Sequence, residues 1–195
     1  MHQERKNREI VAILHNIRSL QNVGSIFRTA DGAGIKKIYL CGITPAPVDR
    51  FGKPRQRLTK VSLGAEEYVE WESAKSAAAV IRKLKKDGYK ILAVEQSRDS
   101  VPYREFKVSA EGGSSFGGKG KKLKVALIVG NEVAGIPKSI LKLADKILEI
   151  PMRGAMVRQA HHPRHIRRGK ESLNVSVAFG IVVYAISCGG RGDAS

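Results

Sequence analysis

The chain has 195 residues, a length that accommodates one α/β domain with a full core, or one such domain with decorations. Its net charge of +17 favours a polyanionic partner, most simply nucleic acid, over a solubility effect or a basic ribosome-adjacent protein. Aromatic residues make up only 6% of the chain, which argues against a base-stacking RNA-binding module. Two cysteines, Cys41 and Cys188, cannot build a disulfide framework or a Cys-x-x-Cys metal site.

Apolar runs alternate with helical patterns along the chain, which is typical of an α/β domain with a parallel sheet. In chain order, the sequence predicts a strand at 10–14, a helix from Asn22 to Gly34, strands at 37–41 and 67–71, a helix at 73–87, strands at 91–95 and 125–129, a short helix at 137–144, a strand at 146–150 and a closing helix at 172–187. Asn22 is of a type that caps helices, and Gly34 is of a type that ends them.

One loop and the lack of long apolar segments also stand out in the sequence. Residues 109–120 are rich in Gly and Ser, which predicts a flexible loop. The first nine residues are polar and charged with no apolar core behind them, and no segment approaches the length of a membrane span. We therefore expect a cytoplasmic protein without a membrane segment.

Four short runs indicate a functional site. The run ESLNVSVA (171–178) alternates small polar and apolar residues before an apolar helix, where polar side chains are costly unless each has a partner. The run IVGNE (128–132) ends a strand, where α/β folds place ligand groups. The other two runs are NVGSIFR (22–28), at the start of the first helix, and IPM (150–152), at the end of the last strand.

In this order, NVGSIFR, IVGNE and the pair of IPM with ESLNVSVA resemble the TrmH-type family of SPOUT RNA methyltransferases, from about Val11 to Ile186. The resemblance implies an enzyme that moves a methyl group from S-adenosylmethionine to a ribose 2′-hydroxyl of tRNA or rRNA. It also implies a homodimer with an α/β-knot fold, in which a parallel sheet flanked by helices is closed by a C-terminal trefoil knot. We expect a single domain that spans residues 1–195.

The resemblance gives catalytic roles to five residues, which are Arg28, Asn22, Glu132, Ser172 and Asn174. Because an arginine is almost never neutral, Arg28 suits phosphate binding and stabilisation of a developing alkoxide better than the role of general base. Each residue also has a purely structural explanation. Arg28 could be a surface phosphate clamp or form a salt bridge, and Glu132 could stabilise a helix N-terminus. Ser172 or Asn174 could cap a helix.

The resemblance places the cofactor around Gly130, Ile150, Met152 and Leu173, where backbone groups of three loops would hold the adenosine. No metal site is expected. The histidines between 155 and 169 are interrupted by Pro163, and no carboxylate or thiol lies near them in the sequence.

In the resembled family, only a few residues separate the IPM and SLN runs, so residues 155–169 are interpreted as an insertion in the active-site loop. A tolerated insertion is favoured because loops absorb added length cheaply, but four arginines could also make it an RNA-binding arm. Two other functions stay open. One is a catalytically impaired knotted RNA-binding protein or ribosome-assembly factor, and the other is a methyltransferase that acts on a base nitrogen, which these motifs favour less.

Overall fold

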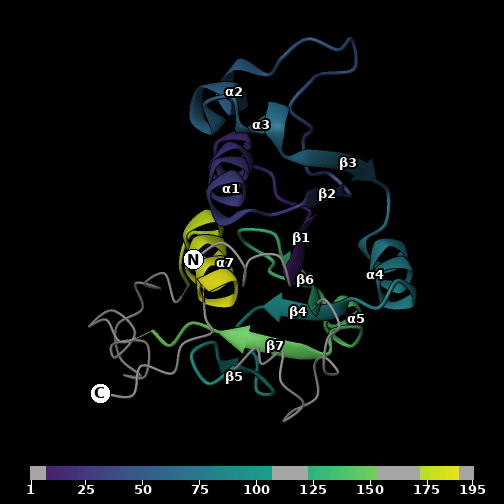
Figure 1. The fold of residues 1–195 in the computed structure, drawn as a ribbon, viewed down its shortest axis with the longest axis vertical. Coiled ribbons are helices and arrows are strands. Elements are labelled where there is room, and N and C mark those ends of the chain that lie inside the picture. Colours follow the sequence, from purple (N-terminus) through teal and green to yellow (C-terminus); the bar gives the residue numbers. More distant parts are fainter. Residues whose placement is uncertain (1–7, 107–122, 153–171, 189–195) are drawn as a thin grey trace, which may run out of the picture.

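The computed structural model describes residues 8–106, 123–152 and 172–188. The loop predicted at 109–120 and the insertion predicted at 155–169 lie outside these residues. Within the described residues, seven strands form one sheet in the order β3-β2-β1-β6-β4-β7-β5 (Figure 1). Every neighbouring pair of strands is parallel, so the predicted α/β architecture with a parallel sheet flanked by helices is confirmed.

The strands are β1 (Arg8–His15), β2 (Lys37–Cys41), β3 (Glu70–Ala74), β4 (Lys90–Val94), β5 (Val101–Pro102), β6 (Leu123–Val129) and β7 (Lys146–Glu149). The helices are α1 (Leu20–Ala33), α2 (Gln56–Ser62), α3 (Ala65–Tyr68), α4 (Ala77–Lys86), α5 (Lys138–Leu141) and α7 (Val175–Cys188). The central strands β1 and β6 are apolar over most of their length, as strands covered on both faces are. Leu14 of β1 lies opposite Val129 of β6, so these two strands end at the same edge of the sheet.

The side chains of β1 alternate between two hydrophobic clusters on opposite faces of the sheet. Ile10, Ala12 and Leu14 belong to the cluster that α1 and α7 cover, whereas Val11 and Ile13 belong to the one that α4 and α5 cover. Figure 1 shows α1 and α7 side by side on their face. Within the described part of the chain, no helix has both the length and the apolar character needed to cross a bilayer.

Helix α1 carries the first motif run. Its N-cap is Ser19, whose Oγ accepts a hydrogen bond from Asn22 N at 3.3 Å, so the predicted cap at Asn22 is wrong. The helix ends at Gly34 as predicted, and the left-handed φ of 72° there favours glycine. Gly24 lets α2 approach closely, because a Cβ on Gly24 would lie only 2.5 Å from Leu58 O.

Other predicted boundaries are displaced for local reasons. Strand β3 begins at Glu70 rather than 67, because residues 65–68 form the helical turn α3. Helix α4 begins at Ala77 rather than 73, because Ser76 caps it. Helix α7 begins at Val175 rather than 172, since the polar residues before it belong to the site described next. The short helix α5 is also shorter than predicted.

Candidate active site

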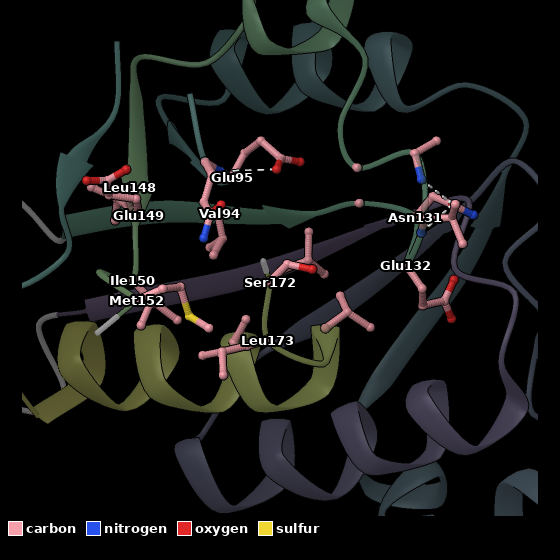
Figure 2. Close-up of a pocket in the computed structure, with 18 residues that line it drawn as sticks. Val94, Glu95, Asn131, Glu132, Leu148, Glu149, Ile150, Met152, Ser172 and Leu173 are labelled. Carbon is pink, nitrogen blue, oxygen red and sulfur yellow. Dashed lines mark hydrogen bonds between the residues drawn. The ribbon is translucent and has the colours of Figure 1, made fainter. Parts of the chain in front are cut away.

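A pocket of about 350 Å³ opens at the edge of the sheet where β4, β6 and β7 end. The carboxyl edge of a parallel sheet is where α/β proteins bind ligands. The lining residues lie at 94–96 and 129–135, at the ends of β4 and β6, and between 148 and 152 and between 172 and 178. Figure 2 shows these side chains around the pocket, with the segment that precedes α7 on one side.

Six of the nine predicted site residues line this pocket. They are the four predicted cofactor residues, Gly130, Ile150, Met152 and Leu173, and two of the predicted catalytic residues, Glu132 and Ser172 (Figure 2). The other three, Asn22, Arg28 and Asn174, are not among the lining residues. Segments far apart in the sequence thus meet at one place.

The turn that follows β6 requires glycine at Gly130. A Cβ there would lie 2.6 Å from Gly135 C, a backbone atom that cannot move aside without shifting the turn. Asn131 holds the turn, because its Oδ1 accepts hydrogen bonds from Val133 N and Ala134 N, each at 2.9 Å. The glycine of the second motif run therefore allows two backbone segments to approach each other beside the pocket.

A carboxylate outside the motif runs closes the same turn. Glu95 directly follows β4 and lines the pocket, and its Oε2 accepts a hydrogen bond from Ile136 N at 2.7 Å. In the sequence, Glu95 was expected only as the last residue of a strand. The signal that could find it is an acidic residue close behind a buried apolar strand: Glu95 directly follows β4, and Glu132 is the third residue after β6.

Glu132 joins the turn after β6 to the start of α1. Its Oε2 accepts a hydrogen bond from Arg18 N at 3.1 Å, and its Oε1 accepts from Ser19 N and from Asn22 Nδ2, both at 3.0 Å. Burial alone would raise the pKa of Glu132. Hydrogen bonds from the backbone N–H groups of Ser19, Arg18 and Glu132 itself, and from the Asn22 amide, outweigh burial and lower this pKa below its usual value. The carboxylate is therefore ionised at neutral pH.

Asn22 also links the first motif run to the last. Its Oδ1 accepts a hydrogen bond from Asn174 Nδ2 at 3.1 Å. Asn174 directly precedes α7, and its Oδ1 accepts from the N and Oγ atoms of Ser176 at 2.8 and 2.7 Å. Asn174 therefore acts as a helix cap and as a bridge to α1 at the same time.

Arg28 lies apart from this network. It is six residues beyond Asn22 on α1, which corresponds to about 9 Å along the helix axis at 1.5 Å per residue. Its neighbours Ile26 and Phe27 are buried in the core, whereas Arg28 is exposed. The structure therefore does not bring Arg28 to the pocket of its own chain, and it leaves the guanidinium accessible to an external phosphate.

A parallel sheet with a ligand pocket at its carboxyl edge is typical of cofactor-binding α/β enzymes. Within that class, the chain belongs to the SpoU rRNA Methylase family, whose sequence model matches residues 9–184. The resemblance to TrmH-type SPOUT methyltransferases is thereby confirmed.

Individual relatives agree with this assignment. The chain is 26% identical over 181 residues to the tRNA (guanosine(18)-2′-O)-methyltransferase of Aquifex aeolicus (strain VF5), covering 93% of this chain and 70% of that protein. It is 24% identical to the protein of the same name from Escherichia coli (strain K12), with 92% and 63% covered. The fold is similar to that of the AdoMet-bound rRNA methyltransferase from Sinorhizobium meliloti, with a TM-score of 0.67 and 26% identity over 92% of this chain and 57% of that one. The chain thus spans between 63% and 70% of the length of these two curated relatives.

Proposed function

We propose that this chain is an RNA methyltransferase that moves a methyl group from S-adenosylmethionine to a ribose 2′-hydroxyl of tRNA or rRNA. The observation that carries the proposal is the pocket at the carboxyl edge of the sheet, where parts of the IVGNE, IPM and ESLNVSVA runs meet. The family assignment, the two relatives that are named tRNA 2′-O-methyltransferases and the AdoMet-bound structural neighbour support the same reaction.

The pocket residues fit S-adenosylmethionine in size, polarity and charge. The volume of about 350 Å³ lies within the range of about 300–1,000 Å³ found for small-molecule sites. Apolar side chains such as Ile150 and Leu173 suit an adenine ring. Three carboxylates, on Glu95, Glu132 and Glu149, line the same pocket and favour a ligand that carries a positive sulfonium group.

In the reaction, S-adenosylmethionine supplies the electrophilic methyl group that the ribose 2′-oxygen attacks. Glu132 is a poor proton acceptor, because its pKa is lowered and three donors already occupy its oxygens. We assign it to positioning: it fixes the start of α1 against the turn after β6. Asn22 and Asn174 extend the same positioning to the segment before α7. Ser172 lines the pocket and is exposed, so we assign it to contact with the ribose.

Arg28 is assigned to the RNA. Its guanidinium is exposed and permanently charged, so it can bind a phosphate beside the target ribose and stabilise the negative charge that develops on the 2′-oxygen. This role requires RNA to lie across α1, because Arg28 does not line the pocket.

A homodimer formed through the outer face of α7 is part of the proposal. Helix α7 is apolar on most sides, and Val177 and Tyr184 leave 49% and 44% of their surface exposed. A helix that is hydrophobic all round is normally buried, so we expect the exposed face of α7 to pack against a second copy of the chain. Light scattering should give twice the mass of the 21.3 kDa chain, and the mass of a monomer would contradict the dimer.

The chain is further proposed to form a single domain with a C-terminal trefoil knot. Membership of the family and the presence of residues from both sides of 153–171 around one pocket support a chain that returns through its own fold there. We propose that the reaction takes place in the cytoplasm, where tRNA and rRNA are present.

Transfer of a labelled methyl group tests the reaction. The protein is incubated with methyl-labelled S-adenosylmethionine and cellular RNA, and the RNA is digested to nucleosides. We expect label on ribose 2′-oxygens. Label confined to a base would establish a base-nitrogen methyltransferase, and RNA binding without transfer would establish the catalytically impaired RNA-binding protein. Absence of S-adenosylmethionine binding in calorimetry would remove the pocket assignment.

Residues 155–169 are proposed to be dispensable for cofactor binding. Joining Gly154 to Lys170 removes four arginines and takes the net charge from +17 to +13. We expect the shortened protein to bind S-adenosylmethionine at least as tightly in calorimetry, since fewer residues must be ordered near the pocket. If RNA methylation is lost while cofactor binding is kept, the insertion is an RNA-binding arm.

A further inference from the structure

The loop between β2 and α2, residues 42–55, forms a projection that we call the β2–α2 finger. Figure 1 shows it extending beyond α2, at the end of the molecule away from β7. None of the four motif runs includes it. Its internal hydrogen bonds, however, are more extensive than a plain connection between a strand and a helix requires.

Hydrogen bonds hold the tip of the finger in one conformation. Asp49 Oδ1 accepts from Phe51 N at 2.8 Å and from Lys53 N at 2.9 Å, and Asp49 N donates to Lys53 O at 2.8 Å. Gly52 has a φ of 77°, a left-handed conformation that glycine adopts without strain. The carboxylate of Asp49 is therefore engaged in building the turn.

The tip presents an aromatic ring to solvent. Phe51 is 70% exposed, whereas Phe27 and Phe179 are fully buried in the core. The guanidinium of Arg50 lies 4.6 Å from the centroid of the Phe51 ring, as in a cation–π pair. A single exposed apolar side chain is common on protein surfaces. This ring differs because an ordered turn holds it outward and a cation lies against it, which suits a surface that binds a planar partner.

The charge around the ring indicates what it binds. Residues 42–60 contain one acidic residue, Asp49, and five basic residues, which are Arg50, Lys53, Arg55, Arg57 and Lys60. Phosphate groups complement this charge, and RNA additionally offers unpaired bases that stack on aromatic rings and guanidinium planes. An ordinary apolar protein partner would gain nothing from the five cations.

The base of the finger is tied to the wall of the pocket. Ile43 N donates to Asn16 Oδ1 at 3.1 Å, and Asn16 O accepts from the pocket residue Asn131 through its Nδ2 at 2.7 Å. Next to this link, Thr44 Oγ1 accepts from Ile17 N at 3.1 Å. A nucleotide held at the tip is therefore held in a defined position relative to the pocket.

We propose that the β2–α2 finger binds the RNA substrate by stacking Phe51, together with Arg50, on an unpaired base while the neighbouring basic side chains bind phosphates. This inference rests on the proposed function and adds an RNA contact away from the methylated ribose. The low aromatic content of the chain does not oppose it, because one ring on an ordered tip is sufficient for one stacking contact.

Phe51→Ala tests the stacking directly. One stacked base contributes about 1–3 kcal/mol, so affinity for unfractionated tRNA and for a short labelled single-stranded RNA should fall about 5- to 150-fold. Affinity for an RNA duplex should change less than about twofold, since a duplex offers no unpaired base. The slope of log affinity against log salt should stay the same, because the ring releases no counterions. Phe51→Trp should retain the affinity, and stacking should quench the fluorescence of the introduced ring.

Tyr68→Ala is the matched control, because Tyr68 is 80% exposed but lies on α3 beside Glu66 and Glu67. It should leave RNA affinity unchanged. The stacking proposal is overturned if Phe51→Ala binds single-stranded RNA within about twofold of the wild type, if duplex binding falls equally, or if the variant changes the oligomeric state instead. Methyl transfer by the wild type, measured in parallel, distinguishes a failure of the stacking proposal from a failure of the proposed function. If the wild type transfers methyl groups and Phe51→Ala binds RNA with unchanged affinity, only the stacking proposal for the finger is contradicted. If the wild type transfers none, the proposed function itself is contradicted.

Discussion

Replacing Glu132 by glutamine changes the charge at the centre of the hydrogen-bond network and nearly preserves the shape. The carboxylate accepts hydrogen bonds from Arg18 N at 3.1 Å and from Ser19 N and Asn22 Nδ2 at 3.0 Å. A glutamine amide has a single oxygen, which can serve the two donors that now bind Oε1. Its NH₂ group then faces Arg18 N–H, so two donors oppose each other and one backbone N–H loses its acceptor.

The size of the effect follows from these contacts. A hydrogen bond to an ionised group contributes about 1.5–3 kcal/mol, and one between neutral groups contributes about 0.5–1.5 kcal/mol. Glu132→Gln removes one charged hydrogen bond and converts two others to the neutral type. The low ends of these ranges give about 3.5 kcal/mol. Because Glu132 is only half-buried, water screens its charge, and we expect the loss in the free energy of unfolding to be reduced to about 2 kcal/mol.

This loss should depend on pH in a defined direction. The pKa of Glu132 is lowered in the folded chain, so its contribution is present above the unfolded value of about 4.3 and is lost as pH falls through the folded pKa. The wild type and Glu132→Gln should therefore differ by a constant amount between about pH 6 and 8, and should converge below about pH 4.

Urea denaturation at several pH values measures this difference. Glu67→Gln is the control, because Glu67 is exposed on α3, and its effect should stay within about 0.5 kcal/mol. Two results would refute the reasoning. One is a difference below about 0.5 kcal/mol for Glu132→Gln at neutral pH, and the other is a difference that stays the same in acid.

Three further substitutions separate chemistry from positioning. Arg28→Ala should reduce methyl transfer about 100-fold or more, with unchanged melting temperature and calorimetric cofactor affinity, and near-wild-type turnover would exclude Arg28 from the mechanism. Asn174→Ala should lower stability by about 1 kcal/mol and slow transfer, whereas Asn174→Ser, which can still cap α7, should recover stability in urea denaturation without recovering transfer. Gly130→Ala should weaken S-adenosylmethionine binding about tenfold or more in calorimetry, because the added Cβ would lie 2.6 Å from Gly135 C. Gly180→Ala, whose Cβ would meet its nearest neighbour at an ordinary 3.6 Å, should bind normally, and equal affinities for the two variants would contradict the role of the turn.

The strands were the most predictable part of the fold. Strand β2 matches its predicted bounds, 37–41, and the ends of β4, β6 and β7 lie within two residues of prediction. Buried parallel strands are continuous apolar runs, so their sequence signal is strong. Helix α2 was missed because only Leu58 and Ser62 are buried in it, which leaves no apolar stripe to detect. Strand β5 has only two residues and therefore no detectable period.

The site was predictable where a short run of sequence carries it and unpredictable where partners are distant. Nothing local to Glu95 indicates that its partner is the N–H of Ile136, 41 residues later. The choice of helix cap shows the same limit. Ser19 and Asn22 are both residue types that favour helix caps. Ser19 is the cap, while the side chain of Asn22 is hydrogen-bonded to Glu132, which is 110 residues away in the sequence.

The contacts among the motif residues explain why these residues occur together. Glu132, Asn22 and Asn174 come from three separate segments and form one continuous chain of hydrogen bonds. Removing one of them leaves a polar group of its neighbour without a partner, so their effects on stability should not be additive. Gly24 and Gly130 act by a different means, since each allows a backbone approach that a Cβ would block. The contacts of Glu132, Asn22 and Asn174 therefore fix α1, the turn after β6 and the start of α7 around the pocket. In the proposed function, cofactor binding is assigned to the pocket lining and RNA contact to exposed groups such as Arg28.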